Sequence, residues 1–285
     1  MSKSKKLITF IVCIICLLTY LQYENKALEI TTIEVEDSKI PKSFDNFSII
    51  QISDLHDAEF GENQKNLIEK VKEIDPDIIV ITGDFIDFSR YNIENSSNFI
   101  YGVSDSYKVY YVPGNHEAAL KSRYEEVQDN LQEAGATVLD NENYKICKDN
   151  KCINLIGVQD ISFIENKDEN ILKNTISELK DESLYNILLS HRPNLWEIYE
   201  KAGMDLVLSG HAHGGQIRLL FTNGLYAPDQ GVFPQYTSGA NKFGNTLVVI
   251  SRGLGNSRFP FRVNNRPEIV NIILHNSWLK QKNML

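Results

Sequence analysis

A carboxylate and an imidazole follow the apolar run at residues 49–52, where Asp54 and His56 are separated by one residue. Alternate side chains of an extended segment point the same way, so these two groups would project together from the end of a strand. Alone, the pair is a weak signal, because an aspartate two residues before a histidine occurs by chance in many proteins. The pattern becomes informative because the chain repeats it.

Four further apolar runs end in residues of similar chemistry. These endings are Gly83-Asp84 after residues 77–82, Gly114-Asn115-His116-Glu117 after residues 108–112, His191 after residues 185–189, and His211 and His213 after residues 205–209. Five of the six histidines of the chain lie at such positions. Because ligands of open α/β sheets bind beyond the carboxyl ends of the strands, we interpret these endings as one site.

The side chains of this site supply oxygen and nitrogen ligands but no thiolate, a set that suits Mn²⁺, Fe or Zn²⁺. The candidate metal ligands are Asp54, His56, Asp84, Asn115, His191, His211 and His213. Seven candidates are too many for one tetrahedral ion. We therefore expect two divalent ions with Asp84 as the shared carboxylate. Such a pair can hold a bridging hydroxide as the nucleophile for in-line displacement at phosphorus.

His116 stands next to a candidate ligand and is expected to point toward the leaving group as a general acid, kept cationic by Asp87. Glu117 fits a catalytic role and an ordinary acidic residue at a helix N-terminus equally well. Among four arginines in the loop at residues 252–266, Arg252 lies nearest a strand end and is the candidate for binding substrate phosphate, together with Asn115. A solvated loop is the alternative reading of these arginines.

The elements that must position these residues alternate between strand and helix. Helical spacing of apolar residues predicts helices over residues 64–74, 93–101, 124–133 and 169–179 between the apolar strands. Beyond His213 the pattern predicts strands at 216–220, 235–241, 246–251 and 268–274. Cys147 and Cys152 flank a four-residue loop between two strand-like runs, and we expect them to form a disulfide across a hairpin.

In order and spacing, Asp54-x-His56, Gly83-Asp84-x-x-Asp87, Gly114-Asn115-His116-Glu117, His191 and Gly210-His211-x-His213 resemble the motifs of the calcineurin-like metallophosphoesterases. The sequence of residues 210–218 and 251–255 is similar to sequences of the bacterial membrane-associated branch typified by the YkuE and YaeI proteins. The resemblance implies an α/β (α+β) fold, a four-layer αββα sandwich of two mixed sheets flanked by helices. It also implies one metal on Asp54, His56, Asp84 and His213, and another on Asp84, Asn115, His191 and His211.

The N-terminal segment is unlike the rest of the chain. Three lysines precede an almost uninterrupted apolar run at residues 7–21, which is typical of a signal peptide or a short signal-anchor. We expect an uncleaved transmembrane helix in the cell membrane, with its lysines cytoplasmic and the catalytic domain extracytoplasmic. An N-terminal core helix is the alternative. The expected divisions are an anchor at 1–28, a linker and first strand at 29–44, and a metallophosphoesterase domain at 45–285.

Charge and motifs together define the expected function. Residues 1–28 carry a net charge of +3, so the remainder carries −12, which disfavours broad nucleic-acid binding. We predict a monomeric, metal-dependent hydrolase of phosphomonoesters, phosphodiesters or pyrophosphates at the membrane or cell envelope, acting on a lipid-linked or nucleotide-linked substrate. The alternatives are a cyclic-nucleotide phosphodiesterase or nuclease, and a metal-bearing scaffold that has lost catalysis.

Overall fold

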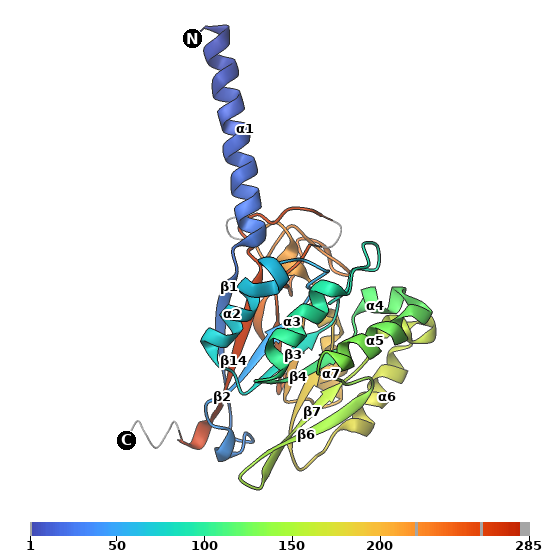
Figure 1. Ribbon diagram of the computed structural model, residues 1–285. Coiled ribbons are helices and arrows are strands. Elements are labelled where there is room, and N and C mark those ends of the chain that lie inside the picture. The colour runs from blue at the N-terminus through green and yellow to red at the C-terminus, as the bar shows by residue number, and fades with distance from the viewer. Residues whose placement is uncertain (1, 220–221, 257–258, 280–285) are drawn as a thin grey trace.

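The computed structural model describes residues 2–219, 222–256 and 259–279 (Figure 1). Its first helix, α1 (Lys3–Lys26), projects away from the rest of the chain, and its apolar side chains between Leu7 and Leu18 are exposed. At 24 residues it is about 36 Å long. Within the described residues, α1 is the one helix long and apolar enough to cross a membrane by length and composition.

The first sheet contains six strands and carries the N-terminal half of the site. In spatial order its strands are β1 (Glu29–Asp37), β14 (Glu268–Asn276), β2 (Phe47–Ile52), β3 (Ile78–Thr82), β4 (Lys108–Val112) and β5 (Ala136–Val138). Strand β14 pairs parallel with β1 and antiparallel with β2, whereas β2 to β5 pair in parallel. The sheet is therefore mixed, as expected.

The second sheet is also six-stranded and mixed. Its order is β12 (Gly239–Phe243), β13 (Thr246–Ile250), β9 (Leu206–Ser209), β8 (Tyr185–Leu189), β7 (Lys151–Gly157) and β6 (Glu142–Lys148). The two outer pairs, β12 with β13 and β6 with β7, are antiparallel, and the central strands are parallel. Strands β10 (Tyr226–Ala227) and β11 (Gly231–Val232) form a separate two-stranded ribbon.

Helices cover the outer face of each sheet. On the first sheet they are α2 (Lys65–Ile74), α3 (Glu94–Ser104) and α5 (Tyr124–Glu133), and on the second α6 (Glu169–Leu179) and α7 (Trp196–Lys201). Short helical segments complete the connections: α4 (Asn115–Ala119) and the 3₁₀ turns at 42–44, 62–64, 121–123, 161–163, 165–167, 193–195 and 213–215.

Three apolar cores separate the four layers. Ile49 of β2 packs between the two sheets with Ile187, whereas its neighbour Ile50 packs under the helices of the first sheet. Because both faces of β2 are buried, its apolar residues do not alternate with exposed polar ones, and its one fully buried polar side chain, Gln51, is hydrogen-bonded. The expected four-layer αββα sandwich is confirmed.

Several local expectations need correction. The cysteine hairpin turns through two residues, Asp149 and Asn150, instead of four, and both have positive φ. The expected disulfide is confirmed, since Cys147 and Cys152 are direct partners across β6 and β7 and are bonded. The strand expected at 216–220 is wrong over its described residues, where Ile217 forms only a single bridge; residue 220 lies outside the described residues.

Candidate metal centre

Strand ends from both sheets bring side chains that could hold metals together in three groups, of which two contain the candidate ligands and the third joins His56 to Asp87 and His116. In the first group, His56 Nε2 lies 3.2 Å from His213 Nε2, and His213 Nε2 lies 3.4 Å from an oxygen of Asp54. Two nitrogens bound to one ion at about 2.1 Å lie about 3.4 Å apart in a tetrahedral geometry. The spacing of this group therefore matches that of ligands around a metal ion.

The second group contains Asp84, His191 and His211. His191 Nε2 lies 3.3 Å from Asp84 Oδ2 and 3.1 Å from His211 Nδ1. The same Asp84 oxygen lies 3.7 Å from His56 Nε2 of the first group. Asp84 thus faces both groups, which is the position that the sequence analysis gave it.

Hydrogen bonds fix which ring nitrogen two of these histidines present. His191 Nδ1 lies 2.8 Å from the carbonyl oxygen of Thr82, and a carbonyl only accepts, so Nδ1 carries the proton and Nε2 presents its lone pair. The ring of His211 is turned the other way, because its Nε2 lies 2.8 Å from a carboxylate oxygen of Asp229. Partners of this kind orient histidines that bind metals.

Burial favours the neutral imidazole that cations require at two of the ligands, whereas burial raises the pKa of Asp54, and the Asp84 carboxylate outweighs burial to raise the pKa of His191 to about 10. Burial lowers the pKa of His56 to about 3 and lowers that of His213 well below its ordinary value, so both imidazoles are neutral. Burial alone would raise the pKa of Asp84, but the neighbouring His191, His116 and His56 lower it well below its ordinary value. Neutral imidazoles beside an ionised carboxylate are a donor set that divalent ions bind.

Asn115 provides a further test of this fit. Its side-chain Oδ1 is buried, yet it accepts a hydrogen bond from none of the described residues. A buried oxygen without a partner costs about 1–3 kcal/mol, so such atoms need an explanation. An ion beside Asp84 would give the Asn115 oxygen a partner.

Comparison with known proteins agrees with this geometry. The model of the calcineurin-like phosphoesterase family matches residues 47–215, more than half of the chain. The chain belongs to this family. It is therefore a metallophosphoesterase, a hydrolase of phosphoester bonds, as the motifs indicated.

The relatives include bacterial proteins of the expected branch. The chain is 32% identical to the uncharacterized metallophosphoesterase YkuE of Bacillus subtilis, over 88% of this chain and 87% of YkuE. It is 28% identical to the phosphodiesterase YaeI of Escherichia coli, over 78% of this chain and 80% of YaeI. Among solved structures, TT1561 of Thermus thermophilus aligns with a TM-score of 0.47 and 14% identity, over 73% of this chain and 89% of TT1561.

The loops that carry the candidate ligands of this phosphoesterase have unusual backbone conformations. Six site residues have positive φ although none is glycine: Asp54, His56, Asp57, Asp84, His211 and His213. Each costs of order 1–3 kcal/mol, and such residues cluster at functional sites. Two glycines also fit this picture, because Gly83 has φ of 85° and a Cβ at Gly114 would lie 2.3 Å from Asp84 Oδ1.

Glu117 holds two of these loops together. Its Oε1 accepts hydrogen bonds from the backbone N–H groups of Phe85 (2.8 Å) and Ile86 (3.0 Å). Its Oε2 accepts from those of Asp84 (3.0 Å) and Gly114 (2.8 Å). One fully buried carboxylate therefore satisfies four backbone donors from the loops after β3 and β4. Of the two roles considered for Glu117, the catalytic one is not supported, since Glu117 acts through the backbone that positions Asp84.

His116 and Asp87 lie close together at the edge of the metal groups. His116 Nδ1 lies 3.7 Å from an oxygen of Asp87, and its Nε2 lies 3.9 Å from Asp84. Burial lowers the pKa of His116, but Asp87 and Asp84 outweigh this and raise it above its ordinary value. The backbone N–H of Phe88 donates to His116 Nδ1 at 3.4 Å, which leaves a ring proton on Nε2. The role of His116 as general acid stays a prediction.

Arg252 lies in a different environment from the one we expected. Its guanidinium Nε lies 2.9 Å from Glu268, and an Nη lies 3.4 Å from Glu29. Its side chain nevertheless packs near the metal groups, because a Cβ on Gly214 would lie 3.0 Å from Arg252 Cγ. Phosphate binding by Arg252 stays a prediction, and it would compete with two carboxylates for the guanidinium.

Sequence reasoning missed a chain of charged residues behind His211. Asp229 contacts the His211 ring and forms an ion pair with Arg192, which in turn pairs with Asp160 at 2.7 Å. Arg192 and Asp160 are almost fully buried. In the sequence, the position of Arg192 directly after His191 was the one indication of this chain of charged residues. The positions of Asp160 and Asp229 gave no such indication.

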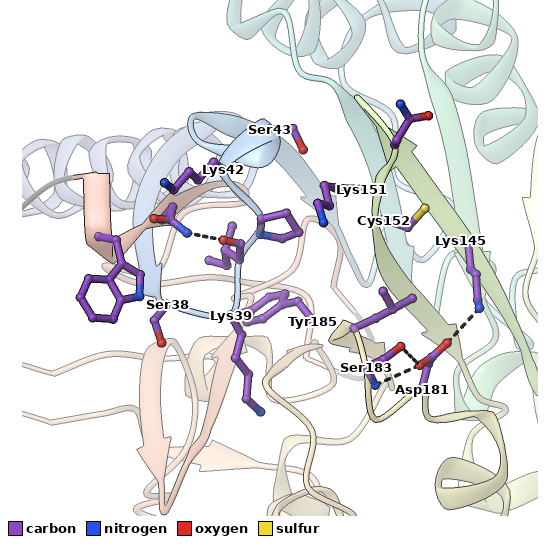
Figure 2. A pocket seen from close by; sticks show the side chains of 16 residues that line it. Ser38, Lys39, Lys42, Ser43, Lys145, Lys151, Cys152, Asp181, Ser183 and Tyr185 are labelled. Carbon is purple, nitrogen blue, oxygen red and sulfur yellow. Dashed lines mark hydrogen bonds and ion pairs between the residues drawn. The ribbon is translucent and has the colours of Figure 1, made fainter.

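Two hollows in the surface differ in their relation to the site. A cavity of about 340 Å³ adjoins His56 and is also lined by Asn25, Lys26, Arg90 and Leu254. A larger one of about 710 Å³ lies between residues 38–43 and the β6–β7 hairpin, where Figure 2 shows Lys39, Lys145 and Asp181. It lies at the amino ends of β7 and β8, whereas the site lies at carboxyl ends, so of these two cavities the smaller adjoins the metal groups.

Proposed function

We propose that this phosphoesterase uses two divalent ions, Mn²⁺, Fe or Zn²⁺, to hydrolyse phosphoester or phosphoanhydride bonds at the membrane. The observation that carries the proposal is the shared carboxylate: Asp84 Oδ2 lies within 3.7 Å of imidazole nitrogens from both ligand groups. The first ion would be held by Asp54, His56, Asp84 and His213, and the second by Asp84, Asn115, His191 and His211. When bound, the ions supply an activated water and neutralise charge on the phosphate oxygens.

The residues of the chain supply positioning and a proton. Thr82 and Asp229 orient the rings of His191 and His211, and Glu117 fixes the backbone around Asp84. His116 holds a proton at Nε2 that it donates to the leaving oxygen, because Nδ1 accepts from the backbone N–H of Phe88. The 340 Å³ cavity beside His56 offers space for the substrate.

We further propose that α1 anchors the enzyme in the cell membrane as a single-pass helix, with the catalytic domain extracytoplasmic and monomeric. The support is the exposed apolar surface of α1 and the three lysines that precede this surface. The divisions at residues 1–28, 29–44 and 45–285 remain part of this proposal. So does Arg252 as a second group, with Asn115, that binds the substrate phosphate.

The experiment uses the full-length protein in detergent, loaded with Mn²⁺, Fe²⁺ or Zn²⁺ and assayed with a panel of chromogenic phosphomonoesters and phosphodiesters. Metal analysis of the same samples should find two ions per chain. Asp84→Asn and His191→Ala should lose both metal and hydrolysis. His275→Ala is the matched control, because His275 lies outside the site, against Glu34 and Asp45.

His116→Ala separates chemistry from metal binding. It should keep wild-type metal content and hydrolyse esters with poor leaving groups slowly, with less effect on esters whose leaving group needs no proton. A wild-type protein that binds two ions but hydrolyses no phosphoester would favour the non-catalytic scaffold. A wild-type protein that binds no ion would overturn the proposal.

A further inference from the structure

The topology places the metal groups at the edge of the fold where α1 joins it. Strand β1 begins at Glu29, with two residues between it and the end of α1, and β1 is parallel to β14, which is antiparallel to β2. The carboxyl end of β2 therefore lies at the edge where β1 starts. Asp54 and His56 follow that end, so the metal centre and the end of α1 share one edge of the first sheet (Figure 1).

The end of α1 is packed against the catalytic domain. Asn25 donates from Nδ2 to the carbonyl of Pro260 at 2.8 Å and accepts from the N–H of Arg262 at 2.7 Å. Glu24 is buried and pairs with Arg266 at 2.9 Å. These contacts fix the direction in which α1 leaves the domain.

The same contacts show how far the domain reaches along the helix. The Tyr20 hydroxyl donates to Asn264 Oδ1 at 2.9 Å. Tyr20 lies six residues before the end of α1, which is about 9 Å along the helix. It also lies within the apolar run of residues 7–21. The loop that contains residues 259–264 therefore reaches the level at which the apolar part of α1 ends.

Two aromatic side chains of this loop are exposed at that level. Phe259 and Phe261 are 46% and 38% exposed, and they flank the Pro260 that Asn25 contacts. Their backbone is held in place, because Gln216 Nε2 donates to both of their carbonyls. Exposed phenylalanine rings on a fixed backbone beside the end of an apolar helix are side chains of the kind that membrane-bound surfaces bury at the boundary of headgroups and acyl chains.

We propose that Phe259 and Phe261 seat this face on the lipid bilayer, so that the phosphoester reaches the metal centre from the membrane surface. The 340 Å³ cavity beside His56 is lined by Asn25 and Lys26 from the end of α1, so it opens at the same junction. An amphiphilic phosphoester can place its phosphate in this cavity while its chains stay in the bilayer. This inference deepens the proposed function, on which its account of the substrate depends.

The membrane contact is tested by quenching, without any assay of activity. Phe259→Trp and Phe261→Trp are each made in the full-length protein, which is reconstituted into bilayers with lipids brominated on the acyl chains. In brominated bilayers, most of the fluorescence emission that either new tryptophan adds in unbrominated bilayers should be lost. Tyr101→Trp is the matched control, because Tyr101 is 56% exposed in the last turn of α3, before β4 begins at the opposite edge.

Emission at Tyr101→Trp should be the same in both lipids, with native Trp196 and Trp278 as the shared background. Unquenched emission from folded Phe259→Trp and Phe261→Trp would overturn the proposal. In that case the aromatic pair faces water, a second copy or a protein partner.

The substrate route is tested by a ratio of two rates. Full-length Phe259→Ser/Phe261→Ser and wild type are assayed on a soluble chromogenic phosphodiester and on a phospholipid phosphoester in vesicles. The ratio of lipid to soluble turnover should fall roughly tenfold, the equivalent of about 1.4 kcal/mol of lost apolar burial. An unchanged ratio would overturn the route from the membrane. Failure of wild type on the soluble ester would instead count against the proposed function, while the quenching result would still stand.

Discussion

Replacement of Glu117 by glutamine tests whether one buried carboxylate holds the metal loops in place. The change keeps the size of the side chain but turns one oxygen into an amide NH₂. Each oxygen now accepts from two backbone N–H groups, at 2.8 and 3.0 Å. In Glu117→Gln, two of these four donors would therefore face another donor.

The magnitude follows from the two lost acceptor contacts. A buried donor without a partner costs about 1–3 kcal/mol, so the unfolding free energy should fall by about 2–6 kcal/mol. For a protein of this size, 1 kcal/mol corresponds to about 2–4 °C, so Tm should fall by on the order of 10 °C. The backbone of Asp84 should also loosen, which should weaken metal binding by about 10–100-fold.

The assay is thermal unfolding of the full-length protein in detergent, followed by circular dichroism and measured with metal removed. Removing the metal keeps the hydrogen-bond effect apart from any loss of ions. Glu125→Gln is the matched control, since Glu125 is exposed in the first turn of α5. If Glu117→Gln unfolds at the same temperature as Glu125→Gln and binds metal equally well, Glu117 does not hold these loops.

Three further predictions concern stability. Arg252→Ala should lower the unfolding free energy by up to about 3–5 kcal/mol in urea titrations, because it leaves the buried Glu268 without its cation; unchanged metal content with a raised KM would in addition support phosphate binding. Burial raises the pKa of Tyr110 to about 12 from an ordinary 10, so its contribution to stability is complete below pH 10 and is lost as pH rises to 12. Between pH 10 and 12 the unfolding free energy of wild type should therefore fall by up to roughly 2.7 kcal/mol more than that of Tyr110→Phe, as measured by urea titrations. Chelation of the metal should lower Tm, and Mn²⁺ at about 100 times its Kd should restore about 2.7 kcal/mol for each of the two sites, whereas Asp84→Asn should respond to neither treatment.

The sequence predicted the parts of the fold that periodicity encodes. Helices α5 and α6 begin and end at the predicted residues, because their apolar spacing is regular. The hairpin turn was predicted too long, although Asp149 and Asn150 are residue types that tolerate positive φ and favour a two-residue turn. The strand at 216–220 was wrong: among its described residues Ile217 forms a single bridge to Val263 and Leu219 is exposed, so an apolar pair in a loop resembled a strand.

The candidate ligands could be predicted because each follows an apolar strand, but the residues that orient them could not. Glu117 left two readings open, because a sequence does not show that four backbone donors from two loops converge on its carboxylate. Arg252 was assigned to phosphate from its place after a strand, and its pairing with Glu268 depends on the neighbouring strand β14. Contacts of this kind are set by tertiary structure alone.

The buried ion pairs behind His211 have a role that stability does not explain. Burial of Arg192 with Asp160 carries a desolvation cost, and an apolar pair of similar volume is often as stable or more so. The second contact of Arg192, to Asp229, supplies the reason, because Asp229 in turn holds the His211 ring. Arg192 fixes Asp229, Asp229 fixes the Nε2 side of the ring, and Nδ1 is left facing His191. The chain of charged residues therefore orients one ring nitrogen of His211.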